Sequence, residues 1–144
     1  MAFWTGRYAG RGEFRHLCEA SDLAFLVQAN VQGRVDQLTG DREIVPGVSV
    51  HLVGGHTPGL QVVRVRTAGG WVVIGSDAAH YRENLDADRP FSIVHTLPLM
   101  YDAFDRLHEL AGPEGVIVPG HDPAVLTQFP TRIPECGGSI VTVA

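Results

Sequence analysis

The chain has 144 residues, enough for one domain with a sizeable core and too few for two comfortable ones. Its composition of 44% hydrophobic and 19% charged residues is typical of a soluble globular protein. A formal net charge of -5 and the lack of a basic run exclude a nucleic-acid partner. The sequence holds no apolar stretch of membrane-spanning length and no signal-peptide core at its start, so we expect a cytoplasmic location and no membrane partner.

The N-terminal part of the sequence predicts an irregular arm followed by a helix. Residues 1–20 mix glycines with arginines and aromatic residues, and we expect them to form an arm of a single domain that spans residues 1–144. In SDLAFLVQANVQG, residues 21–33, apolar residues recur at the spacing of an amphipathic helix. Ser21 or Asp22 is expected to cap its first turn.

Short apolar segments separated by turn residues predict strands in the middle of the chain. We expect strands over residues 34–38, 42–47 and 48–55, with a hairpin turn at residues 39–41. The segments QVVRVRT and WVVIGSD, within residues 61–77, flank Ala68-Gly69-Gly70 and predict a further hairpin. Its first arm alternates valines with arginines, which predicts one buried and one wet face. Its second arm is a continuous apolar run, typical of a strand covered on both faces.

The C-terminal part predicts a second helix and two more strands. TLPLMYDAFDRLHELAG, residues 96–112, follows the helical period and ends at Gly112-Pro113. The next segment, GVIVPGHD, predicts a short strand, a Pro-Gly break and a histidine at the exit, and the tail SIVTVA predicts an edge strand. The apolar face of the helix is expected to comprise Leu97, Met100, Tyr101, Phe104, Leu107 and Ala111.

The two cysteines, Cys18 and Cys136, lie far apart in the sequence and have no metal-type spacing. Because disulfides are rare in reducing compartments, we interpret both as buried or semi-buried thiols.

Three polar side chains each follow a predicted strand and a break of small residues: His56, Asp77 and His121. Because a sheet brings strand ends together and strand-end loops commonly carry function, we expect these side chains to converge. Two imidazoles and a carboxylate suit zinc or a similar first-row ion, and a carboxylate can bridge two metals. The alternative is that each histidine is an ordinary hydrogen-bonded residue. We adopt that interpretation for His16, His51, His95 and His108.

Three motifs, GGHTPGLQVVRV, GSDAAHYRENL and VPGHDPAVL, occur in this order along the chain. Together with AFWTGR, GRVDQLTGDREIVPGV and RPFSIV they closely resemble the metallo-β-lactamase superfamily, and within it the N-acyl homoserine lactonase-like hydrolases. The resemblance runs from about Phe3 to Pro130. It implies an α/β (α+β) fold, the C-terminal half to two-thirds of an αββα sandwich in which two mixed sheets pack face to face with helices outside.

The resemblance also implies roles for individual residues. His56 matches a ligand of the first metal, Asp77 matches the aspartate that bridges both metals and can carry a proton, and His121 matches a ligand of the second metal. Lactonases of this family place a tyrosine a few residues after the bridging aspartate, where it contacts the substrate carbonyl. Here His80 stands at that position and Tyr81 follows it, and either side chain can donate a hydrogen bond to a developing oxyanion.

The HxHxDH motif, which supplies ligands to both metals in this family, is absent from the 144 residues. Two ligands for each metal fall short of the three or four protein ligands of stable zinc sites. We therefore expect the chain alone to bind its pair of zinc or similar divalent ions weakly and to hydrolyse little. Either the sequence is a truncated product, which is the interpretation we favour, or a partner covers the apolar sheet face that the missing half leaves exposed.

The leading functional hypothesis is a metal-dependent hydrolase that opens N-acyl homoserine lactone-type rings by metal-bound hydroxide, as the resemblance implies. Its partner is then a small-molecule lactone or ester. A thioesterase or a glyoxalase-type hydrolase is an alternative, because the motifs specify metal ligands rather than substrate. An alternative from another class is a non-catalytic chain that forms a homo-oligomer through its uncovered sheet face.

Overall fold

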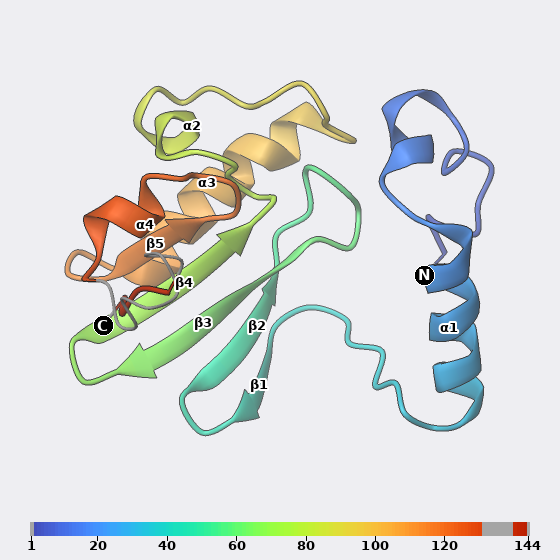
Figure 1. Cartoon of the computed structure of the whole chain (residues 1–144), viewed down its shortest axis with the longest axis horizontal. Coiled ribbons are helices and arrows are strands. Elements are labelled where there is room, and N and C mark those ends of the chain that lie inside the picture. The colour runs from blue at the N-terminus through green and yellow to red at the C-terminus, as the bar shows by residue number, and fades with distance from the viewer. Residues whose placement is uncertain (1, 131–139, 144) are drawn as a thin grey trace. The chain divides into compact units, whose positions relative to one another are not determined.

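The computed structural model describes residues 2–130 and 140–143 of the chain (Figure 1). The chain divides into two compact units, Met1–Thr39 and Gly40–Ala144. None of the helices in the described part is both long and apolar enough to cross a membrane. In chain order the elements are η1 Gly12–His16, α1 Ala20–Val31, β1 Arg42–Val45, β2 Val48–Leu52, β3 Gln61–Thr67, β4 Gly70–Ser76, α2 Arg82–Asp86, α3 Leu97–Ala111, β5 Val116–Pro119 and α4 Val125–Gln128.

The first unit contains the short 3-10 helix η1 and the helix α1, which confirms the predicted first helix. The capping prediction is wrong, because the N-cap is Glu19 and no side chain makes a cap hydrogen bond. An aromatic cluster links the start of the chain to η1: the Phe3 ring meets Trp4 and Phe14 edge-on at centroid distances of 5.0 and 5.2 Å. Cys18 is a partly buried free thiol, as predicted, and Cys136 lies outside the described residues.

The second unit is built on a five-stranded sheet in the order β1-β2-β3-β4-β5. Adjacent strands are antiparallel except β4 and β5, which are parallel. The predicted strand over residues 34–38 and the hairpin turn at residues 39–41 are wrong. Instead β1 pairs with β2, and the turn between them falls at Gly47, whose φ is +81° and whose amide donates to Glu43 Oε1. A left-handed backbone favours glycine there, so this position sets the hairpin register.

The β3–β4 hairpin is confirmed, with Thr67 paired to Gly70 across the turn. One face of the sheet packs against α3, where Val62 and Val73 join Met100 and Leu107 in a core that excludes solvent. The fully buried residue of β3 is therefore Val62. The valines that alternate with the arginines, Val63 and Val65, are only partly buried, contrary to the prediction of a buried face. The arginines of β3 share the face of Val62, and the guanidinium of Arg64 stacks 3.6 Å above the Trp71 ring.

The opposite face of the sheet carries two rows of branched apolar side chains. Val72 is buried, Ile74 is 45% exposed, and the other members are partly exposed. The prediction that β4 is covered on both faces is therefore wrong for Ile74. One row comprises Val50, Val63, Ile74 and Val118, and the other comprises Val48, Val65, Val72 and Val116.

The predicted second helix is confirmed as α3, which ends before Gly112. Two residues of its expected apolar face are exposed, Leu97 by 51% and Tyr101 by 38%. Leu97 begins the helix, and Tyr101 lies at the side of the buried stripe formed by residues such as Met100, Phe104 and Leu107. The stripe that contacts the sheet is therefore narrower than the apolar pattern of the sequence.

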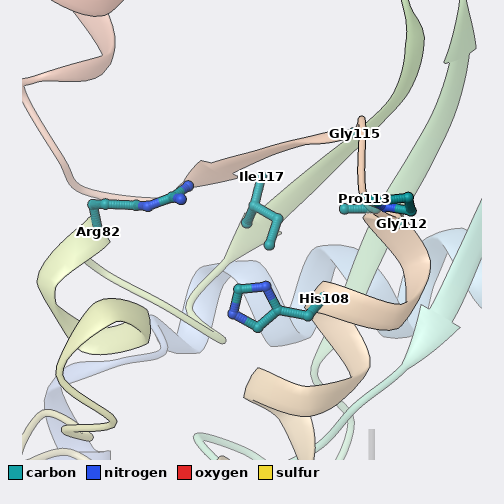
Figure 2. A pocket seen from close by; sticks show the side chains of 7 residues that line it. Arg82, His108, Gly112, Pro113, Gly115 and Ile117 are labelled. Carbon is teal, nitrogen blue, oxygen red and sulfur yellow. The ribbon is translucent and has the colours of Figure 1, made fainter.

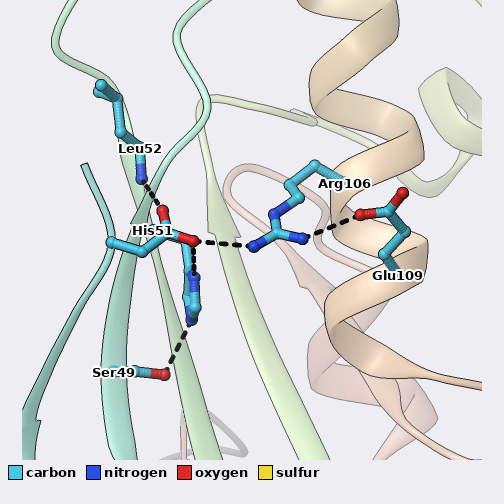
Figure 3. Close-up of polar contacts among 6 residues, drawn as sticks. Ser49, His51, Leu52, Arg106 and Glu109 are labelled. Atoms are coloured by element: carbon cyan, nitrogen blue, oxygen red, sulfur yellow. Dashed lines mark hydrogen bonds and ion pairs between the residues drawn. The ribbon is translucent and has the colours of Figure 1, made fainter.

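A polar network links β2 to α3 (Figure 3). His51 is buried, and its Nδ1 donates to Asp41 Oδ2 at 2.8 Å while its Nε2 lies 2.8 Å from Ser49 Oγ. The guanidinium of Arg106 donates to the same Asp41 oxygen at 2.8 Å and to Glu109 at 2.9 Å. His51 is thus the hydrogen-bonded structural histidine that the sequence predicted.

Candidate metal centre

The carboxyl ends of three strands meet at one edge of the sheet. Since β2 and β4 are both antiparallel to β3, they run in the same direction, and β5 is parallel to β4. The loop after β2 carries His56, the loop after β4 carries Asp77 and His80, and the loop after β5 carries His121. The polar residues singled out from the sequence therefore follow strand ends on the same edge.

The structure gathers Asp77, His80 and His121 into one cluster. His121 Nε2 lies 2.8 Å from Asp77 Oδ1, and His80 Nε2 lies 3.4 Å from the same oxygen. One possible ligand atom from each residue lies within 4.8 Å of the other two. This donor set of two imidazoles and one carboxylate fits zinc or a similar divalent ion.

Two short loops are tied together around this cluster. The amide of His121 donates to the carbonyl of His80 at 2.9 Å, and the amide of Gly120 donates to the carbonyl of Ala79 at 2.9 Å. A side chain at Gly120 would place its Cβ 2.5 Å from the carbonyl oxygen of Ser76. Glycine is therefore required for the close approach of the two loops.

The His80 ring is held by aromatic contacts. It stacks on Phe91 with a centroid distance of 3.5 Å and an interplanar angle of 10°, and its centroid lies 4.4 Å from that of His121. Burial lowers the pKa of His80 below its ordinary value of 6.5, and the neighbouring His121 lowers it further while Asp77 opposes both effects. The imidazole is accordingly neutral near pH 7, with a lone pair on one ring nitrogen.

His56 is positioned by the two glycines before it. Gly55 has a φ of +83°, and a Cβ there would lie 2.7 Å from Met100 Sδ, so the loop packs tightly against α3. His56 is 7% exposed, and its Nδ1 donates to the carbonyl of Ile93 at 2.7 Å. This bond leaves Nε2 as the possible ligand atom, an arrangement common for histidines that bind metals.

The cluster differs from the ligand set that the resemblance implies. Among the described residues, the three-ligand cluster contains His80 and does not contain His56, whose ring centroid lies 6.1 Å from that of His80. Sequence reasoning assigned His80 only an oxyanion contact. The spacing of three residues between Asp77 and His80 within one loop is the feature that would have indicated a shared ligand set.

Tyr81 lies beside the cluster at the start of α2. Its side chain is 47% exposed, and its ring centroid lies 6.4 Å from that of His80. Its amide donates to Asn84 Oδ1 at 2.8 Å, which fixes the backbone where the loop enters the helix. The tyrosine hydroxyl is therefore carried on an anchored backbone near the candidate centre.

The described part of the second unit has one cavity beside the cluster and another along α3 and β5. One of about 700 Å³ is lined by Asp77 and His121 together with the apolar side chains of Ile74, Val118 and Leu126. The other, of about 450 Å³, is lined by residues of α2, the end of α3 and β5. Figure 2 shows Arg82 and His108 reaching toward Ile117 in this second cavity. Asp77 and His121 line the first cavity, and none of the candidate site residues lines the second.

No protein-family model matches the chain. Over 87 residues it is 36% identical to an N-acyl homoserine lactonase of Bacillus cereus and 34% identical to the N-acyl homoserine lactonase AiiA of Bacillus thuringiensis subsp. kurstaki. These matches cover 59% of this chain and 34% of each relative. The chain thus spans about a third of the length of the curated relatives it matches.

Solved structures agree with this similarity. An N-acyl homoserine lactone hydrolase with N-hexanoyl-L-homoserine at its catalytic metal centre superimposes with a TM-score of 0.58 and 32% identity, over 65% of this chain and 38% of that chain. AidC, a dizinc quorum-quenching lactonase, gives a TM-score of 0.55 over 72% and 36%, and at 21% identity it supports the fold alone. The chain is therefore similar over 59% of its length to the N-acyl homoserine lactonases, and its mixed α/β fold is part of the metallo-β-lactamase fold that they share.

Proposed function

We propose that the chain supplies part of the metal centre of a hydrolase that opens lactone rings. The observation that carries the proposal is the convergence of Asp77, His80 and His121 at one strand edge, in a chain similar to lactonases. The cavity beside Asp77 and His121 has apolar walls, which suit the acyl chain of a small lactone. A small-molecule lactone or ester is accordingly the proposed substrate class.

In this proposal His56 and Asp77 would hold one divalent ion, and Asp77 and His121 would hold a second. Such ions, when bound, polarise a carbonyl and lower the pKa of a water molecule. Asp77 then orients the reacting groups and carries a proton to the leaving oxygen. Tyr81, which is 47% exposed, or His80 donates a hydrogen bond to the oxyanion that develops on the substrate carbonyl.

Ring-opening assays test the proposal. The chain would be loaded with zinc and assayed on N-hexanoyl-homoserine lactone, alone and joined to the HxHxDH-bearing segment of a Bacillus lactonase. We expect turnover in the joined protein, little in the chain alone, and loss of turnover on Asp77→Asn. A joined protein that folds and binds zinc but leaves the lactone intact contradicts the proposal, and hydrolysis of thioesters in its place favours the thioesterase alternative.

A second candidate function rests on the apolar rows of the sheet. A non-catalytic chain that assembles as a homo-oligomer would bury Ile74 and its neighbours against a second copy. Sheets pack face to face through such branched side chains. Sedimentation velocity tests this candidate, since it requires an oligomer whose mass falls when the rows are made polar.

A further inference from the structure

We propose that His80 is a metal ligand in this chain, so that Asp77, His80 and His121 together bind one divalent cation of the zinc type. The inference rests on the proposed function and deepens it, because it adds a protein ligand to the same centre. It departs from the ligand set that the resemblance implies, where the position of His80 contacts substrate. It leaves Tyr81 as the hydrogen-bond donor to the substrate.

The distances between the ligand atoms carry the first step. Tetrahedral zinc with nitrogen and oxygen ligands at about 2.0–2.2 Å separates those ligands by roughly 3.3–3.6 Å. The distance of 3.4 Å between His80 Nε2 and Asp77 Oδ1 falls in that range. The distance of 2.8 Å between His121 Nε2 and Asp77 Oδ1 must lengthen by about half an ångström. Two of the three ligand pairs therefore lie at or near the separation that one cation requires, and the third pair lies within 4.8 Å.

The chemistry of the cluster carries the second step. Two imidazole nitrogens converge on one carboxylate oxygen, which gives three ligands of the types that zinc prefers. With His80 counted, the chain alone reaches the three protein ligands of many zinc sites, whereas Asp77 and His121 alone provide two. The expectation that the chain alone binds metal weakly assumed only two ligands for each ion.

The rigidity of the surroundings carries the third step. The His80 ring is stacked on Phe91 at 3.5 Å, and the backbone bond from His121 to His80 holds the two loops at a fixed separation. Because these side chains are already held in place, they lose little conformational entropy when they bind a cation. The side chains of Asp77 and His121 are 34% and 56% exposed, so a cation reaches the cluster from solvent.

Metal titration of the full chain tests the inference without any lactone. The apo protein would be titrated with Co²⁺ and followed by its visible d–d absorption, with stoichiometry from equilibrium dialysis. We expect one saturable site, and a loss of affinity of at least about tenfold on His80→Phe, which keeps an aromatic ring on Phe91 and removes the ligand nitrogen. His108→Gln, a change at an exposed position of α3 outside the cluster, is the matched control and is expected to leave this site intact.

A second measurement covers the case in which His80→Phe misfolds. On addition of Zn²⁺ to the wild-type chain, the ring ¹⁵N resonances of His80 and His121 are expected to shift, while that of His108 stays in place. Unchanged affinity in a folded His80→Phe variant, an unshifted His80 ring, or a chain without a saturable site overturns the inference. None of these outcomes depends on lactone turnover, so failure of the inference and failure of the proposed function remain distinguishable.

Discussion

The amide of His121 donates a hydrogen bond of 2.9 Å to the carbonyl of His80. This bond joins the loop after β5 to the loop after β4, and the helices α2 and α3 and the strand β5 lie between the two loops in the chain. The parallel pairing of β4 with β5 places both loops at the same sheet edge. The geometry of the candidate centre therefore depends on backbone contacts as much as on the ligand side chains.

Gly120→Ala is expected to disturb both the fold and the centre. The added Cβ would lie 2.5 Å from the carbonyl oxygen of Ser76, so the two loops must separate. We expect a loss of about 1–3 kcal/mol in the free energy of unfolding, measured by urea denaturation, together with weaker Co²⁺ binding. Gly59→Ala is the matched control, because a Cβ there meets no atom within 4 Å. Equal stability of the two variants would contradict the close approach.

Leu107→Ala is expected to destabilise the second unit strongly. Leu107 is fully buried between α3 and the sheet, and its removal leaves a cavity in the core. We expect a loss of about 2–5 kcal/mol in the free energy of unfolding. Leu97→Ala in the same helix removes a side chain that is 51% exposed, and a change of less than about 1 kcal/mol is expected. Similar losses of unfolding free energy from both substitutions would contradict the conclusion that Leu97 lies outside the buried stripe of α3.

The contrast between these two leucines shows where sequence patterns reach their limit. The helical period predicted α3 and its end at Gly112, because local propensity and apolar spacing agree there. The same period placed Leu97 and Tyr101 on the buried face. Periodicity identifies the apolar side of a helix, but it does not show how much of that side the sheet covers. In the same way, alternation in β3 identified two faces, and packing against α3 decided that Val62 is the buried residue.

The candidate centre was predictable in part for a similar reason. Positions after strand ends are visible in the sequence, so His56, Asp77 and His121 were predicted to converge. The structure places Asp77 and His121 2.8 Å apart, whereas the three-ligand cluster does not contain His56. The contribution of His80 depends on how the loop turns after Ser76, whose φ is +45°. That turn is set by the approach of Gly120 from a distant segment, which local sequence does not encode.

Acid is expected to weaken the link between β2 and α3. The hydrogen bond from His51, supported by Arg106, lowers the pKa of Asp41 below its ordinary value of 3.8. A lowered pKa stabilises the fold above the ordinary value, and this contribution is lost as the pH falls through the lowered pKa. Unfolding free energy measured against pH should therefore fall less steeply in acid for Asp41→Asn than for the wild type. Asp105→Asn, an exposed change in α3, should follow the wild-type curve.

Ile74→Lys tests assembly through the apolar rows, the second candidate function. Ile74 lies in the centre of an apolar row and is 45% exposed, so the charged side chain would oppose burial of that face against a second copy. If the chain assembles through the rows, the wild type sediments as an oligomer and Ile74→Lys as a monomer of unchanged fold. Leu99→Lys on α3, where the leucine is 41% exposed and lies outside the rows, should keep the wild-type mass. A wild-type monomer with a high melting temperature would argue against assembly, because the fold would then be stable with its apolar rows exposed to solvent.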